Sequence, residues 1–168
     1  MTRSSIGTVR GIPRDVSVEA GGFVARAETL EVVTSDRVQL IDITDRVLAF
    51  VRASGVQEGI VSICSLHTTC ALFINETQNA LHADIRTFLE RIAPRGGGWK
   101  HDDPAHSDCD RTNTDSHLRA MVLGHGLTLQ IGGGELVLGQ WQRVLVGELD
   151  GPRARTIRLH ALGAGPSR

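Results

Sequence analysis

Two runs of branched apolar residues near the middle of the chain most constrain its fold. The stretch GIVSICSLHTTCALFINE contains strand-like segments at 59–66 and 70–75, separated by His67, Thr68 and Thr69. Both segments are apolar on both faces of the two-residue alternation, which is typical of strands buried on two sides of a sheet. A chain with such strands is expected to cover its sheet with further layers.

Further strand patterns flank this centre. They are predicted at 23–33 and 38–44, which form a candidate hairpin across a polar turn, and at 127–131, 135–138, 140–149 and 155–162. The glycine run at 132–134 lacks the Lys-Ser/Thr pair of a phosphate loop, so it is interpreted as a hairpin turn.

Three helices are predicted between the strands, at 44–55, 77–92 and 114–124. The second carries apolar residues at helical spacing, and the third is expected to turn Leu118, Met121 and Val122 inward. Because strands dominate, we predict an α+β fold, a β-sandwich of mostly antiparallel strands with two or three helices.

The length of 168 residues suits a single globular domain, predicted at 23–168, preceded by an amino-terminal arm at 1–22. A net charge of -1 gives no electrostatic reason to expect a nucleic acid or an anionic membrane as partner. No apolar run approaches the roughly 20 residues of a membrane span, and the start lacks the apolar core of a signal peptide. We therefore expect a cytoplasmic protein.

The polar loop at 95–113 is the first candidate for function, because it is long for a simple connection. His101 lies within it, His117 begins the helix that follows, and His67 ends a buried strand. Neutral imidazole is the commonest ligand of zinc, and a catalytic zinc typically takes three protein ligands. The three histidines thus suggest a metal site, with a polar loop and helix-capping residues as the alternative.

Four aspartates near these histidines also have possible roles at a metal site. They could orient the imidazoles or bind magnesium through oxygen, and the group comprises Asp102, Asp103, Asp108 and Asp115. Asn75 and Glu76 could cap the helix that follows them, or Glu76 could act as a general base if burial raises its pKa. Three cysteines without a CxxC pair argue against a disulfide framework and against a cysteine-rich zinc ribbon.

Four blocks occur in a fixed order along the chain: HTTCALFINE, GGWKHDD, NTDSHLRAMVLG and GELVLGQWQRVLVGELDGPRAR. With these blocks the chain resembles the YjbQ family from about Phe23 to Leu162. The most specific feature is the Trp-Gln pair followed by an acidic residue and DGPR. One departure is Gln140, which stands where the family usually has Thr.

The resemblance implies an α+β fold with a central β-sandwich, assembled as a homotrimer with polar clefts where subunits meet. It also implies a site built from the histidine blocks, in which His67, His101 and His117 hold a divalent metal. We expect zinc, with magnesium as the alternative.

The activity implied by the resemblance is that of a secondary thiamine-phosphate synthase, which joins hydroxymethylpyrimidine diphosphate to a thiazole phosphate and releases pyrophosphate. We expect Asn75, Glu76 and Asp108 to be catalytic. The expected substrate-binding residues are Thr68, Thr69, Lys100, Arg119, Trp141 and Gln142, with Arg143 as a further cation. The alternatives are a metal-dependent hydrolase of a small phosphorylated or amide substrate and a non-catalytic trimeric protein that binds a small ligand.

Overall fold

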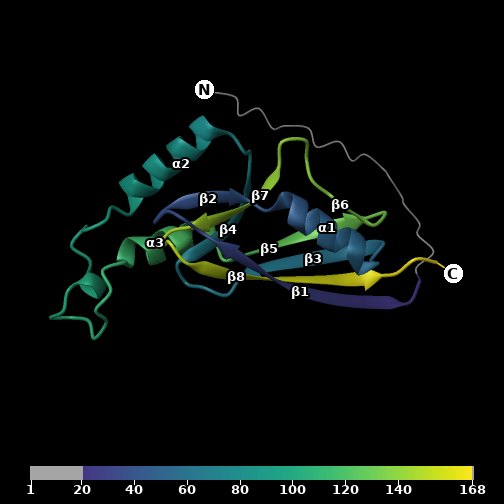
Figure 1. The fold of residues 1–168 in the computed structure, drawn as a ribbon, viewed down its shortest axis with the longest axis horizontal. Coiled ribbons are helices and arrows are strands. Elements are labelled where there is room, and N and C mark those ends of the chain that lie inside the picture. The colour runs from purple at the N-terminus through teal and green to yellow at the C-terminus, as the bar shows by residue number, and fades with distance from the viewer. Residues whose placement is uncertain (1–20, 168) are drawn as a thin grey trace, which may run out of the picture.

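The computed structural model describes residues 21–167, which form two stacked β-sheets and three α-helices (Figure 1). Most of the arm predicted at 1–22 lies outside the described residues. Its last two residues, Gly21 and Gly22, exchange backbone hydrogen bonds with Gly165 near the end of the last strand.

The larger sheet has five strands in the order β1-β8-β3-β5-β6, and every neighbouring pair is antiparallel. The strands are β1 (Phe23–Val33), β8 (Ala154–Ala164), β3 (Glu58–Ser65), β5 (Gly126–Gly132) and β6 (Glu135–Leu136). Along β8, buried Ile157 and Leu159 alternate with the exposed Arg158 and His160. One face of this sheet therefore supplies the core and the other faces solvent.

The smaller sheet has three antiparallel strands, β2 (Gln39–Asp42), β7 (Arg143–Glu148) and β4 (Cys70–Asn75), in that order. In β4, Cys70 and Leu72 belong to the core shared with the larger sheet, whereas Ala71 and Phe73 pack on the opposite face. The predicted burial on both sides is confirmed for 70–73, whereas Ile74 is half-buried and Asn75 is exposed.

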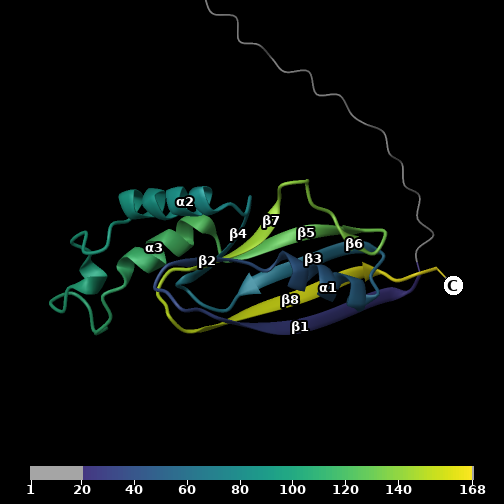
Figure 2. The same ribbon diagram turned by 45° about the horizontal axis from the view of Figure 1, so that its top comes forward.

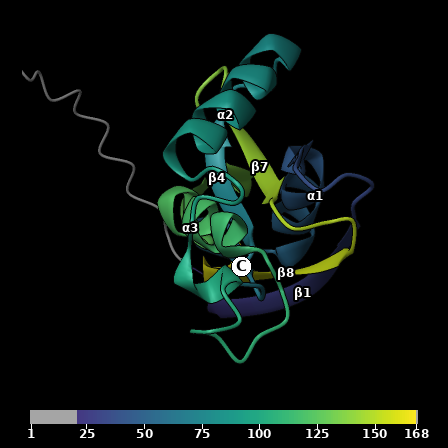
Figure 3. The ribbon, with the colours of Figure 1, turned by 90° about the vertical axis from the view of Figure 1, so that its left-hand side faces the viewer.

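The helices are α1 (Thr44–Ser54), α2 (Asn79–Ile92) and α3 (Thr114–Leu123), with a short 3-10 helix, η1, at Lys100–Asp102. The inner side chains of α1, such as Val47 and Val51, join the main core between the sheets. Helices α2 and α3 lie together against the far face of the smaller sheet, opposite β1 and β8 (Figures 2 and 3). None of the helices within residues 21–167 has the length and apolar character needed to cross a bilayer.

The predicted fold class is confirmed, and so is the glycine turn. Gly133 and Gly134 join β5 to β6 with φ of 59° and 78°. Positive φ at both central residues matches the turns that suit the twist of a two-residue hairpin, and glycine adopts it without a Cβ clash.

The hairpin predicted between 23–33 and 38–44 is wrong. Strand β1 pairs with β8 over eleven residues, whereas β2 pairs with β7 in the other sheet. The intervening Thr34 bonds to Arg153 and Glu148 instead of closing a turn, so the chain passes from one sheet to the other here. Long-range pairing along the full length of β1 therefore prevails over the local alternative.

Several predicted details also differ. Segment 59–66 is buried on one face only, since Ile60 is 41% exposed and Cys64 is exposed. Helix α2 begins at Asn79, because the Gln78 side chain accepts a hydrogen bond from the Leu81 N–H. The strands predicted at 135–138 and 140–149 shrink to β6 and β7.

The inward face predicted for the third helix is also wrong in part. Met121 and Val122 are 67% and 54% exposed, whereas Asp115, Arg119 and Ala120 are buried. The buried face of α3 is largely polar, so the apolar pattern does not identify it.

Replacement of Leu72, which is fully buried in β4, tests this core. We expect Leu72→Ala to lower the free energy of unfolding by about 2–5 kcal/mol, because the truncation leaves a cavity between the sheets. Leu66→Ala is the matched control, since Leu66 is 59% exposed, and its effect should stay within about 0.5 kcal/mol. Urea unfolding measures both values, and equal losses would contradict the described packing.

Candidate functional site

The imidazoles of His101 and His117 lie together at the end of the molecule that carries α2 and α3. Their ring centroids are 5.3 Å apart and their planes meet at 82°, an edge-to-face arrangement. Asp102 fixes this geometry, because its Oδ1 accepts hydrogen bonds from the Thr114 N–H at 3.0 Å and from the Thr114 hydroxyl at 2.6 Å. The 3-10 helix that carries His101 is thereby tied to the first turn of α3, which carries His117.

The surroundings of His117 favour its neutral form. Burial lowers the pKa of His117, nearby His101 lowers it further, and the Asp150 carboxylate partly opposes both effects. The Ser107 hydroxyl lies 3.5 Å from Nδ1 of His101. A neutral ring offers a lone pair that can accept a proton or bind a metal ion, which is the chemistry expected of these two residues.

His67 occupies a different local setting, in the loop after β3. Its Nε2 accepts a hydrogen bond from the Thr156 N–H at 2.8 Å, which places the proton of the neutral ring on Nδ1. Burial and the Arg155 guanidinium lower the pKa of His67, with Glu148 acting in the opposite direction. In this arrangement a metal ion could bind His67 only by displacing the Nδ1 proton or by breaking the Thr156 hydrogen bond.

Two of the three predicted metal ligands therefore come together in one protomer. Within residues 21–167, no three His, Cys, Asp or Glu side chains of the protomer form a group able to hold a metal ion. The Asp150–Arg153 ion pair, at 3.1 Å, links the two settings electrostatically, since Asp150 acts on the pKa of His117 and Arg153 on that of His67. The zinc or magnesium site remains a prediction.

Beneath His67 lies a fully buried ion pair between Glu148 of β7 and Arg155 of β8. The Arg155 Nε donates to Glu148 Oε2 at 2.7 Å, and its Nη2 bonds to Oε1. Glu148 also accepts hydrogen bonds from the Thr34 hydroxyl at 3.0 Å and the Asp150 N–H at 2.8 Å. Arg155 donates in addition to the carbonyl and hydroxyl oxygens of Thr69. The predicted substrate-binding residue Thr69 is thus a buried partner of this pair.

Steric crowding explains why the DGPR sequence has a glycine at position 151. A Cβ placed there would lie 2.5 Å from the Asp36 carbonyl oxygen and 2.8 Å from Cγ of Glu148. The Gly151 N–H donates to the Arg37 carbonyl at 3.0 Å. Any larger residue at this position would therefore push against the buried Glu148 side chain or the backbone facing it.

A second ion-pair network accounts for the polar buried face of α3. Arg37 donates to both carboxylate oxygens of Asp115 at 2.9 Å, and Asp115 also lies 3.3 Å from Nη1 of Arg119. Arg119 bonds in turn to Glu90 and to the Ala93 carbonyl. This predicted substrate-binding residue is only 2% exposed, and its guanidinium joins α3 to α2.

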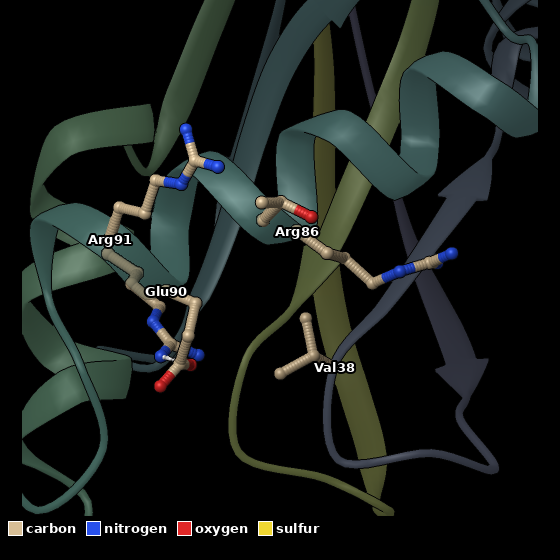
Figure 4. A pocket seen from close by; sticks show the side chains of 6 residues that line it. Val38, Arg86, Glu90 and Arg91 are labelled. Atoms are coloured by element: carbon tan, nitrogen blue, oxygen red, sulfur yellow. Dashed lines mark hydrogen bonds and ion pairs between the residues drawn. The ribbon is translucent and has the colours of Figure 1, made fainter.

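Two cavities flank this network. One, the α2 cavity, has a volume of 460 Å³ and lies between α2 and the residues leading into β2. Arg86 and Arg91 extend from α2 in different directions there, with Val38 and Glu90 between them (Figure 4). The other, which we call the arginine cavity, has a volume of 380 Å³ and lies where the polar loop enters α3.

The remaining predicted site residues are exposed in the protomer. They are Thr68, Asn75, Glu76, Lys100, Asp108, Trp141, Gln142 and Arg143. Trp141 is 66% exposed in the loop before β7. The burial that would make Glu76 a general base is absent in a single protomer.

None of the residues that line the arginine cavity is among the site residues predicted from the sequence. The lining comprises Arg37, Arg95, Asp110, Arg111, Thr112, Asn113, Asp150 and Arg153. Arg95 and Arg111 lie near the two ends of the polar loop at 95–113, which the sequence predicts to be functional. This position in the loop is the one sequence signal that could have indicated the two arginines. That they line the same cavity depends on how the loop folds back, which the sequence pattern does not record.

Glu148→Gln tests the buried ion pair. Burial alone would raise the pKa of Glu148, but hydrogen bonds from Arg155, the Asp150 N–H and Thr34 hold it below its ordinary value. The carboxylate therefore stabilises the fold above the unfolded-state pKa, and this contribution is lost as the pH falls through the lower folded-state value. At neutral pH we expect the substitution to lower the free energy of unfolding by about 3–5 kcal/mol, because it leaves Arg155 buried without its counter-charge.

At acid pH the free energies of unfolding of the wild type and of Glu148→Gln should differ less, since Glu148 itself then becomes neutral. Glu135→Gln is the control, because its ion pair with Arg52 is exposed and solvent-screened, so its loss should change the free energy of unfolding far less. A difference that stays constant with pH would contradict the ionised state of Glu148.

The histidine pair predicts a coupled titration. We expect His117 to titrate below its ordinary pKa, and His101→Gln to raise that pKa because it removes a neighbouring positive charge. Two-dimensional NMR of the imidazole signals measures both values, with His160→Gln, a change at an exposed residue of β8, as control. An unchanged His117 pKa in His101→Gln would show that the rings are not coupled. The lowered pKa means that this group stabilises the fold above the ordinary histidine pKa and less as the pH falls below it.

The comparisons with known proteins agree with the fold and the motifs. The model of the UPF0047 protein YjbQ-like family matches residues 28–164. A UPF0047 protein of Archaeoglobus fulgidus is 42% identical over 133 residues, which cover 79% of this chain and 98% of that protein. A UPF0047 protein of Methanothermobacter thermautotrophicus is 40% identical over 136 residues, covering 81% and 91%.

Solved structures show the same architecture. A YbjQ-like protein from Sulfolobus solfataricus superposes with a TM-score of 0.79 at 34% identity, covering 84% of this chain and 99% of that one. A hypothetical protein from Aeropyrum pernix gives a TM-score of 0.76, also at 34% identity, covering 82% and 98%. Since the family model spans most of the chain and the relatives match over nearly their whole length, this protein belongs to the UPF0047, or YjbQ-like, family.

Proposed function

We propose that the protein is a metal-assisted transferase that acts on small phosphorylated substrates at the His101–His117 pair. The observation that carries the proposal is the edge-to-face contact of these rings, whose centroids are 5.3 Å apart, near a cavity lined by four arginines. From the family resemblance we propose the reaction of a secondary thiamine-phosphate synthase. A bond then forms between the thiazole nitrogen and the pyrimidine methylene carbon while the bond to the diphosphate oxygen breaks.

His101 and His117 would supply two ligands of a tetrahedral zinc ion, and their donor chemistry fits that metal. Because one protomer brings only these two rings together, we propose that the third ligand comes from a neighbouring protomer of a homotrimer, with His67 as the candidate. The bound cation would neutralise the leaving diphosphate, which is the main electrostatic demand of such a reaction. Magnesium bound through carboxylate oxygens is the alternative.

The protein's own residues would bind and orient the substrates. Lys100 lies next to His101 in the same 3-10 helix, so its ammonium could reach a phosphate held at the pair. Exposed Trp141 and Arg143 precede and begin β7, and a homotrimer could bring them, with Asn75 and Glu76, toward a neighbour's histidine pair. The proposed substrate is a small molecule, and we propose a cytoplasmic location for the protein, as the sequence leads us to expect.

A metal-dependent hydrolase is the second candidate. The lowered pKa of His117 favours the neutral ring at physiological pH, and a neutral imidazole can accept a proton from an attacking water molecule. The third candidate is a trimeric binding protein without catalytic activity. In that case the histidines would serve only to hold subunits together through a metal ion or an anion.

Turnover with defined substrates tests the proposal. The full chain is incubated with hydroxymethylpyrimidine diphosphate, thiazole phosphate and zinc or magnesium, and pyrophosphate and thiamine phosphate are measured. We expect pyrophosphate release to require both substrates, and His101→Ala and His117→Ala to lower the rate by about a hundredfold or more. His160→Ala, at an exposed residue of β8, is the matched control and should keep the wild-type rate.

The competing functions give different results in the same assay. Release of phosphate from a single ester without an acceptor would favour the hydrolase. Loss of turnover in His101→Ala with an intact trimer, measured by light scattering, would exclude a purely structural role for the pair. Loss of the trimer itself, with no turnover in the wild type, would instead support the binding protein.

A further inference from the structure

We propose that the arginine cavity is a binding site for the phosphate or diphosphate group of a small molecule. The proposal deepens the function given above and rests on it for the identity of the substrate. The cavity lies at the start of α3, four residues before His117 in the chain, so it adjoins the histidine pair. No sequence motif pointed to it, because its walls come from segments far apart in the chain.

The charge of the lining favours an anion. Four arginines line the cavity, Arg37, Arg95, Arg111 and Arg153, against the two carboxylates of Asp110 and Asp150. Arg37 already binds Asp115 and Arg153 already binds Asp150, so these two are held in place by their partners.

The two remaining guanidinium groups are available. Arg95 and Arg111 are exposed and form no ion pair with any residue among 21–167. A guanidinium presents a planar fork of donors that matches phosphate oxygens in pairs. Two such groups at one cavity provide the positive charge that a dianionic phosphate requires, whereas exposed Asp110 supplies the one carboxylate without a paired cation.

The start of α3 adds partial positive charge to the same wall. Thr112 and Asn113 line the cavity directly before the first helical residue, and the Asn113 side chain makes no capping hydrogen bond to the helix. Asp102 satisfies the Thr114 N–H, so the cavity faces an end of the helix whose dipole is partly but not wholly compensated.

Asn113 also leaves one polar atom without a partner. Its Nδ2 donates to Asp150 Oδ2 at 2.8 Å, which fixes the orientation of the amide, while its Oδ1 is buried with no hydrogen bond to the described residues. Such atoms are rare in folded proteins. A ligand that carries a donor, such as a substrate hydroxyl or amino group, would complete this wall.

The contrast with the α2 cavity narrows the chemistry of the ligand. The α2 cavity contains Val38, the methyl of Thr87 and the aliphatic stems of Arg86 and Arg91, and its Arg119 is fully engaged. The arginine cavity has only charged and polar residues in its lining. A phosphorylated head group therefore suits the arginine cavity and an apolar group does not.

Binding to the full chain tests this proposal without any turnover. Isothermal titration calorimetry at constant ionic strength, with pyrophosphate, inorganic phosphate and acetate as probes, should show one saturable pyrophosphate site per chain. We expect Arg95→Gln and Arg111→Gln each to raise the dissociation constant about tenfold or more, because each removes a charge-assisted contact. Arg86→Gln, which removes an equally exposed cation from α2, should change it by less than about twofold.

Three results would overturn the proposal. They are the absence of saturable binding, equal weakening by Arg86→Gln and Arg111→Gln, and full binding in both cavity variants. Loss of pyrophosphate binding in His101→Ala would also overturn it, since that would place the anion at the histidine pair. The two proposals can be contradicted separately. If turnover depends on His101 but Arg111→Gln binds pyrophosphate as the wild type does, only the cavity proposal is wrong. If binding depends on the arginines but no turnover occurs, only the transferase proposal is wrong.

Discussion

The buried ion pair between Glu148 and Arg155 is the interaction on which the arrangement of the two sheets depends. It joins the last residue of β7 to the second residue of β8, and through hydrogen bonds it also holds Thr34 after β1 and Thr69 before β4. Two charges removed from water are stable only when both are paired and fully hydrogen-bonded, as they are here. The pair therefore ties four chain segments together at one point.

The helical end of the molecule is organised by a second set of charges. Asp115 on the buried face of α3 bonds to Arg37 and Arg119, and Arg119 continues to α2 through Glu90 and the Ala93 carbonyl. These contacts set the position of α3 against the smaller sheet. Because His117 lies in the first turn of that helix and Asp102 ties the 3-10 helix to the same turn, the network also sets the geometry of the histidine pair.

The two networks meet at the segment that follows β7. Asp150 donates its N–H to Glu148 of the first network, and its carboxylate lies 4.0 Å from Arg37 of the second, so it contacts both. Arg153 of the same segment lowers the pKa of His67, and both Asp150 and Arg153 line the arginine cavity. A short, sterically restricted DGPR segment thus connects the buried core to every polar feature that is a candidate for function, which gives a structural reason for so specific a sequence.

The sequence by itself determined the local elements whose pattern is enforced by short-range physics. The two-sided burial of 70–73 follows from the run of apolar residues, and the glycine turn at 133–134 follows from the backbone freedom of glycine. The α+β class follows from the number of strand and helix patterns. Only the tertiary structure decided that β1 pairs with β8, and that Arg119 is locked inside the fold while Met121 is exposed. It also decided that His101 and His117 meet while His67 bonds to Thr156, and that Arg95 and Arg111 share a cavity. Each of these depends on contacts between residues far apart in the chain, whose energies no local pattern records.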